Sequence, residues 1–145
     1  MIDHVELYNS TCRECSKLVT NRYSTSFSMG IKVFDRRFRA PIYAIYGFVR
    51  FADEIVDTFH DKPKAQLLER FKRDTRQGIE EGISLNPVLH AFQETVRRYQ
   101  IEWELIEAFL KSMEMDLYHH SYEEGMYDEY IYGSAEVIGL FMARI

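Results

Sequence analysis

The stretch "YAIYGFVRFADEIVD", residues 43–57, places Arg50, Asp53 and Asp57 one helical turn apart among apolar and aromatic residues. At about 100° per residue, these three side chains and Tyr46 fall within an arc of roughly 60° on an α-helix. Most of the remaining helix surface is apolar, which is typical of a buried helix. A charged stripe on a buried helix is costly unless it pairs or binds an ion. The stretch therefore predicts a buried helix with one polar stripe.

Two interpretations of this stripe stay open on the residues alone. Arg50 and Asp53 can form an ordinary helix ion pair, worth roughly a few tenths of a kcal/mol. Alternatively, two carboxylates one turn apart suit Mg²⁺, which prefers oxygen ligands and often bridges to phosphate. The guanidinium of Arg50 offers a rigid donor fork that matches phosphate oxygens. An Asp-x-x-x-Asp motif by itself is weak, and Tyr46 and Arg50 on the same stripe strengthen it.

The rest of the chain repeats apolar residues at spacings of three and four, with little strict alternation. This periodicity predicts an all-α fold. Asp35 is a candidate N-cap for the central helix, and Pro41 is expected to strain or kink the start of that helix. No repeat or long linker divides residues 1–145, so a single domain is expected. The expected helices cover residues 3–23, 36–59, 64–82, 87–99, 102–120 and 127–145, with a connector over 24–35 that has room for a short helix.

Composition and charge exclude several classes of protein. The net charge of −5 gives no reason to expect a nucleic-acid partner. The first residues lack the apolar core of a secretory signal, and no stretch is long and apolar enough to span a bilayer. Cys12 and Cys15 lack a second ligand pair for zinc and are expected to be reduced thiols. A cytoplasmic protein is therefore expected.

Four segments, taken in order, resemble motifs of the phytoene/squalene synthase family, the head-to-head prenyl synthases. Residues 43–57 resemble the first aspartate-rich motif of that family, and Arg39 falls where the family has an arginine before it. The similarity covers nearly the whole chain and looks closest to the bacterial phytoene synthase branch. The other three segments are "STSFSMG" (24–30), "MEMDL" (113–117) and "YIYGSAEVIGL" (130–140).

The resemblance implies roles for individual positions. Asp53 and Asp57 match the metal-binding pair, and Asp116 matches a supporting residue for Arg50 or Tyr130. The resemblance implies a catalytic role for Tyr46, Arg50, Asp53, Asp57 and Tyr130. The positions implied to bind substrate are Ser24, Phe27, Tyr43, Tyr46, Arg50, Tyr130, Ser134, Ile138, Gly139 and Met142, of which Phe27, Ile138 and Met142 would line a prenyl tunnel.

The fold implied by the resemblance is an orthogonal helical bundle of the isoprenoid synthase type. The implied activity is Mg²⁺-dependent condensation of two prenyl diphosphates, farnesyl or geranylgeranyl, with release of pyrophosphate. Mn²⁺ is an alternative metal, and the use of NADPH is left open. The product would belong to carotenoid or isoprenoid biosynthesis, and peripheral contact with a membrane is a further expectation.

The sequence departs from the family pattern in two places. Glu136 stands where the family signature usually has glycine, and it either crowds the tunnel or faces outward. A second aspartate-rich motif, downstream in the family, does not occur before Ile145. The expectation is therefore a C-terminally incomplete bundle, the N-terminal half of a longer enzyme. This chain alone is expected to bind Mg²⁺-diphosphate weakly, to form no product and to self-associate.

Other functions remain as rivals. A chain-elongating or cyclising prenyl-diphosphate enzyme would share the aspartates but not the Tyr-x-Tyr segment at Tyr130. A non-catalytic family relative that serves as an assembly or scaffold protein has no need of a buried acidic pair at Asp53 and Asp57. A generic helical adaptor predicts that Asp53→Ala is harmless or stabilising.

Overall fold

A computed structural model of the chain describes residues 1–118, 129–130 and 132–145, and within these ranges it contains helices and no strand. The all-α prediction is therefore confirmed. The loop expected after residue 120 lies outside the described residues. The elements are α1 (His4–Tyr23), α2 (Thr25–Ile31), α3 (Arg36–Asp57), α4 (Lys64–Glu81), α5 (Pro87–Tyr99), α6 (Trp103–Tyr118), a π-helical turn η1 (Tyr132–Glu136) and α8 (Val137–Ala143).

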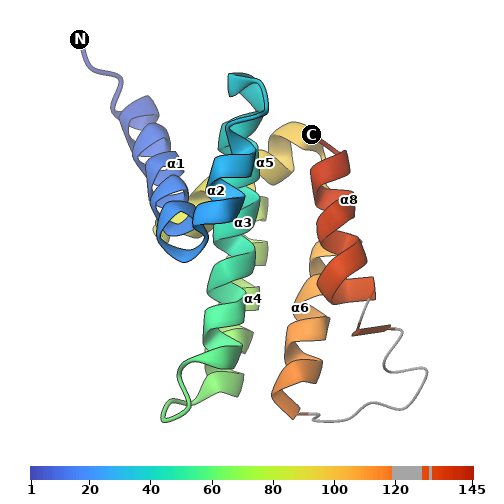
Figure 1. The fold of residues 1–145 in the computed structure, drawn as a ribbon. Coiled ribbons are helices and arrows are strands. Elements are labelled where there is room, and N and C mark those ends of the chain that lie inside the picture. Colours follow the sequence, from blue (N-terminus) through green and yellow to red (C-terminus); the bar gives the residue numbers. More distant parts are fainter. Residues whose placement is uncertain (119–128, 131) are drawn as a thin grey trace.

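Helix α3 runs through the middle of the molecule, with α1 on one side and α6 and α8 on the other (Figure 1). Its apolar side meets α4, α5, α6 and α8 in one hydrophobic core. Phe48 is fully buried there, and its ring stacks on that of Phe92 with centroids 3.8 Å apart. Burial of such aromatic side chains is the main stabilising term of a small domain. The core thus fixes which side of α3 is left for the polar stripe.

The N-cap of α3 follows the sequence-based expectation. The side chain of Asp35 accepts a hydrogen bond from the backbone N–H of Arg37, so the predicted N-cap is confirmed. The helix continues through Pro41 to Asp57 without interruption. Because Pro41 lies close to the N-terminus, its missing N–H removes only one bond near the end of the helix. The helix ends two residues earlier than predicted, with Thr58 as its C-cap.

Two further expectations concern the cysteines and the membrane. Cys12 is buried and Cys15 is half-buried, both on α1, and neither forms a disulfide. The prediction of thiols on the first helix is therefore confirmed. Across the described ranges, no helix combines the length and the hydropathy needed to cross a bilayer.

Candidate functional site

The polar stripe of α3 forms a charged site centred on Arg50. Its guanidinium lies 4.0 Å from a carboxylate oxygen of Asp53 and 3.4 Å from one of Glu54. Both distances are longer than those of a well-formed charge-assisted hydrogen bond. The guanidinium also lies over the ring of Tyr23, 5.1 Å from its centroid. The Nε atom of Arg50 is buried and has no hydrogen-bond partner. Arg50 is therefore held in place with part of its donor capacity unused.

Asp53 lies in an unfavourable place for a negative charge. Burial, the largest cause, raises the pKa of its carboxyl to about 6. Arg50 opposes this shift, whereas the negative charges of Asp57, Asp116 and Glu54 add to it. Since Asp116 belongs to α6, the fold brings an acidic residue of a second helix to face the stripe of α3. A carboxyl with a pKa raised by burial and by like charges is typical of a functional site.

The carboxylates have the ligand type that a divalent cation requires, because Mg²⁺ takes oxygen ligands. Its charge would also relieve the repulsion around Asp53. Asp57 is the last residue of α3 and its side chain is exposed. In the described part of the chain, no three His, Cys, Asp or Glu side chains come together as a complete metal site. The expected buried acidic pair is therefore not observed, because Asp53 is partly buried and Asp57 is exposed. That these two carboxylates hold a metal ion stays a prediction.

Two residues of this site, Glu54 and Tyr23, were not predicted from the sequence. Glu54 pairs with Arg50 and accepts a short hydrogen bond from the hydroxyl of Thr58, which is the largest cause of its lowered pKa. A hydrogen bond to Glu54 is in turn the largest cause of the raised pKa of Tyr23, on α1. The i,i+4 spacing of Arg50 and Glu54 is visible in the sequence and could have identified that pair. No residue pattern within α1 indicates that Tyr23 belongs to this site.

The stripe continues from Arg50 to an aromatic contact with α2. The ring of Tyr46 stacks on that of Phe27 with centroids 4.8 Å apart and planes at 24°. Ser24 is the N-cap of α2, and its hydroxyl accepts a hydrogen bond from the N–H of Phe27 at 3.2 Å. Ser24 therefore sets the position of Phe27, and Phe27 covers Tyr46. The sequence-predicted residues Ser24, Phe27, Tyr46, Arg50 and Asp53 form one continuous series.

Beyond Phe27 an apolar groove of about 530 Å³ opens between α2, the start of α3 and the end of the chain. Phe27 and Met142, two of the three residues implied to contact a prenyl chain, lie on its wall. The third, Ile138, is partly buried and packs against the main core. The complete lining is Ser26, Phe27, Gly30, Ile31, Phe34, Phe38, Ile42, Met142 and Ile145.

The remaining predicted positions lie farther from the stripe. Tyr43 is buried with Ile31 and Ile42 in a small cluster beneath the groove. Gly139 is exposed on α8, with open space where a side chain would begin. Neither position has an observed contact with Arg50 or Asp53.

The Tyr-x-Tyr segment is held against α6 by a glycine. A Cβ on Gly133 would lie 2.4 Å from the carbonyl oxygen of Ala108, so no side chain fits there. This close approach explains why a glycine follows the second tyrosine. Ser134 donates a hydrogen bond at 2.7 Å to the carbonyl oxygen of Tyr130, which is half-buried. Glu136 is exposed, so of the two expectations for this residue the outward one is correct.

Comparisons with known proteins agree on the family. The squalene/phytoene synthase family matches residues 20–145. A presqualene diphosphate synthase of Rhodopseudomonas palustris is 29% identical over 125 residues, 83% of this chain and 44% of that protein. A 4,4'-diapophytoene synthase of Staphylococcus haemolyticus is 26% identical over 129 residues, 85% of this chain and 44% of that protein. The chain therefore spans less than half the length of these relatives.

A solved structure of similar shape supports the fold. The crystal structure of a dehydrosqualene synthase in complex with ligand matches with a TM-score of 0.80 and 20% identity. The match covers 97% of this chain and 48% of that one. At this identity the likeness shows the fold alone, and it confirms the prediction of an isoprenoid synthase-type helical bundle.

Proposed function

The chain belongs to the squalene/phytoene synthase family, and on that premise we propose that it is part of an enzyme that joins two prenyl diphosphates head to head. The observation that carries the proposal is the continuity of two unlike surfaces. The charged site at Arg50 and Asp53 lies next to the stacked rings of Tyr46 and Phe27, and Phe27 also lines the apolar groove. A prenyl diphosphate has the same division into a charged head and an apolar tail.

The proposed reaction begins at the head of one substrate. Its allylic C–O bond breaks, pyrophosphate leaves, and the double bond of the second substrate adds to the allylic cation. Loss of one proton closes a cyclopropylcarbinyl diphosphate. A second ionisation then releases the second pyrophosphate, and the rearranged cation loses a proton to give the hydrocarbon product. When bound, Mg²⁺ supplies positive charge that stabilises the leaving pyrophosphate. Asp53 and Asp57 are the residues proposed to hold it.

Arg50 and the aromatic residues contribute in different ways. The unused donor capacity of Arg50 suits the oxygens of a diphosphate. Tyr46 and Phe27 cover the passage between head and tail, where they keep water from the cation. Aromatic faces also attract a positive charge directly. For Tyr130 we propose a place near the reacting carbons, on the ground of the family motif alone.

The proposed site of action is the cytoplasm, with the protein in peripheral contact with a membrane. The proposed substrates and product carry long apolar chains that partition into bilayers. A farnesyl or a geranylgeranyl chain is compatible with the groove, and a reductive step with NADPH is not part of the proposal.

The test uses the full-length protein to which this chain corresponds, with radiolabelled farnesyl or geranylgeranyl diphosphate and Mg²⁺. We expect the label in a head-to-head product and in its cyclopropylcarbinyl intermediate. A longer linear prenyl diphosphate would establish the chain-elongating rival. A folded protein that binds both substrates without turnover would establish the non-catalytic relative. For the 145-residue chain alone we expect weak binding of Mg²⁺-diphosphate and no product.

A further inference from the structure

The turn between α2 and α3 displays apolar side chains to solvent. Met29 is 65% exposed, Val33 87% and Phe34 52%, although all three are hydrophobic. They lie within six consecutive positions, at the end of α2 and in the turn that follows it. A contiguous apolar patch on a water-facing surface marks an interaction site.

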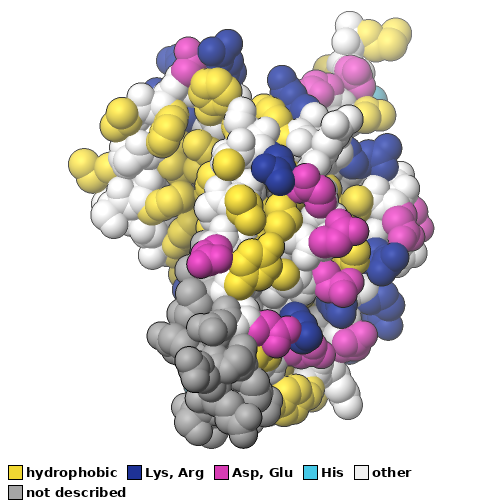
Figure 2. All heavy atoms as spheres, turned by 90° about the vertical axis from the view of Figure 1, so that its right-hand side faces the viewer, with side chains coloured by type: hydrophobic (Ala, Val, Ile, Leu, Met, Phe, Trp, Pro, Cys, Tyr) yellow, Lys and Arg dark blue, Asp and Glu magenta, His cyan; other side chains and the backbone are white. Residues whose placement is uncertain are grey.

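Basic side chains surround this patch. Lys32, Arg36 and Arg37 are exposed, Arg39 is half-exposed, and Asp35 is the single acid within residues 32–39. This segment is strongly positive on a chain whose net charge is −5. Figure 2 shows hydrophobic side chains gathered at its upper left, with Lys and Arg side chains along the upper edge.

The turn is held in its shape by Arg39. Its guanidinium donates hydrogen bonds to the carbonyl oxygen of Phe34 at 3.0 Å and to that of Lys32 at 2.8 Å. The arginine that the family motif places before the central stripe is therefore a support for this turn. A turn fixed in this way presents Val33 and Phe34 outward without the entropic cost of ordering a loose loop.

We propose that residues 29–39 bind the surface of a membrane that contains anionic lipids. Val33 and Phe34 insert at the level of the head groups, and Lys32, Arg36 and Arg37 contact the lipid phosphates. Apolar side chains flanked by lysine and arginine are the pattern by which proteins attach to anionic bilayers. A protein partner without an excess of acidic residues would not account for the basic residues around the patch.

The position of the patch connects it with the groove. Phe34 contributes to both, and Gly30 and Phe38, within the same segment, also line the groove. Binding at this surface would therefore bring the mouth of the groove to the bilayer, so that an apolar chain enters or leaves without crossing water. This route and the membrane contact that it needs rest on the proposed function, which already includes peripheral contact with a membrane, but the lipid-binding test does not depend on turnover.

The experiment is co-sedimentation of the full-length protein to which this chain corresponds, with vesicles of phosphatidylcholine alone or with about one third phosphatidylglycerol, at about 0.05 M and 0.5 M salt. We expect binding to the anionic vesicles that weakens at high salt, because exposed charges are screened. Arg36→Glu/Arg37→Glu and Val33→Ser/Phe34→Ser should each reduce it by about tenfold or more. The matched control Arg70→Glu/Arg73→Glu makes the same charge change on exposed residues of α4 and should bind as the parent does.

Several results would overturn the proposal. Equal binding to neutral and anionic vesicles, or an equal loss in the α4 control, would remove the specific role of the basic surround. If the patch variants changed only the molecular mass in solution, the patch would be a contact between copies of this chain. Circular dichroism checks that each variant is folded. Membrane binding by an enzyme without prenyl transferase activity would refute the proposed function and leave this inference standing.

Discussion

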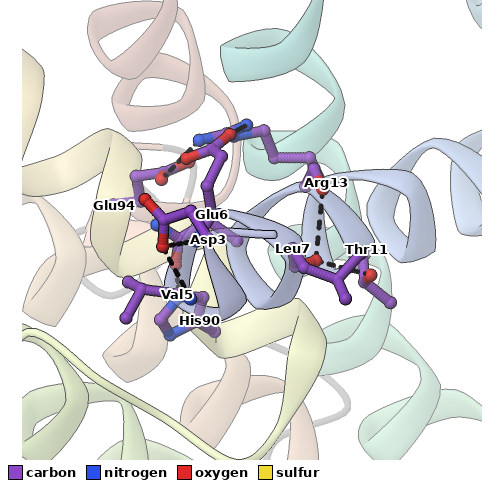
Figure 3. A network of polar contacts seen from close by, with 10 residues as sticks. Asp3, Val5, Glu6, Leu7, Thr11, Arg13, His90 and Glu94 are labelled. Atoms are coloured by element: carbon purple, nitrogen blue, oxygen red, sulfur yellow. Dashed lines mark hydrogen bonds and ion pairs between the residues drawn. The ribbon is translucent and has the colours of Figure 1, made fainter. Parts of the chain in front are cut away.

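Two clusters of partly buried charge in this protein are built in opposite ways. Between α1 and α5, Arg13 contacts both carboxylate oxygens of Glu94 at 2.7 and 2.9 Å and an oxygen of Glu6 at 2.9 Å (Figure 3). On α3, the contacts of Arg50 with Asp53 and Glu54 measure 4.0 and 3.4 Å, and its Nε is unpaired. The guanidinium of the first cluster is well paired, and we call this cluster saturated. The guanidinium of the second keeps unused hydrogen-bonding capacity.

The pKa values show the same difference. The hydrogen bonds that Arg13 donates to Glu94 and Glu6 raise the pKa of its guanidinium, so the folded state stabilises its charge. Burial raises the pKa of Asp53 to about 6, so the folded state disfavours the charge of that carboxyl. Unpaired charge that a fold retains at a cost is a sign of binding, while well-paired charge is a sign of structure. We therefore propose that the α1–α5 cluster contributes to stability and that the α3 cluster binds ligands.

The largest expected effect comes from Asp53→Asn in the full-length protein. Turnover should fall by about three orders of magnitude, since electrostatic stabilisation of the leaving group is a large catalytic term. Stability should rise by about 1 kcal/mol, because the substitution removes a disfavoured charge from a partly exposed side chain. Steady-state kinetics and thermal melting in metal-free buffer measure the two effects.

Glu54→Gln is the matched control for that experiment. Glu54 lies next in sequence, but its pKa is lowered by a hydrogen bond from Thr58, so neutralising it should reduce stability. If Asp53→Asn lost stability as Glu54→Gln does, the α3 cluster would be an ordinary structural network like that of Arg13.

Arg50→Lys is expected to have the second largest effect. Turnover should fall by about a hundredfold while the ion pair with Glu54 persists, because an ammonium group cannot reproduce the planar fork that grips phosphate oxygens. Pyrophosphate affinity, measured by calorimetry with Mg²⁺, should fall along with turnover. Kinetics close to those of the parent would show that Arg50 serves only as a partner for its neighbouring carboxylates.

Arg13→Met tests the saturated cluster. It removes a bidentate pair between partly exposed side chains, so the free energy of unfolding should fall by about 1 to 2 kcal/mol. Turnover per folded molecule should not change. Urea titration and an activity assay at low temperature separate the two quantities. A loss of turnover without a loss of stability would place this cluster in the functional machinery instead.

The sequence predicted the α3 cluster in part and the α1–α5 cluster not at all. The polar stripe, the N-cap at Asp35 and the approach of Asp116 followed from helical spacing and the family motif. The stripe and the N-cap are local, and helix geometry determines them, whereas the place of Asp116 was implied by the family motif alone, as a partner for Arg50 or Tyr130. Arg13 and Glu94 are eighty-one positions apart, and the pairing exists only because α1 packs on α5. Tyr23, the wall of the groove and the contact of Gly133 with α6 depend in the same way on how helices meet.

The smallest expected effect is a difference in the response of the two regions to acid. Near the saturated cluster, His90 is buried and accepts a hydrogen bond from the N–H of Ser84 at its Nδ1, 3.2 Å away. Its Nε2 therefore carries the proton and donates to Asn9 at 2.7 Å. A second proton on His90 would face the N–H of Ser84 and lose that bond.

Burial, the largest cause, lowers the pKa of His90, and Arg13 adds to this while Glu94 opposes it. As the pH falls through about 6.5, the unfolded chain binds a proton at this histidine that the folded chain does not bind, so stability is lost.

Asp53 has the opposite effect on stability. Its folded carboxyl, with a pKa of about 6, binds a proton before the unfolded one does, so stability is gained as the pH falls below 6. The slope from either group cannot exceed about 1.4 kcal/mol per pH unit. In metal-free urea titrations between pH 7.5 and 5, His90→Gln should therefore lose less stability on acidification than the parent, and Asp53→Asn should lose more. Parallel curves for the two variants would mean that the two regions do not differ in the way their charges are held.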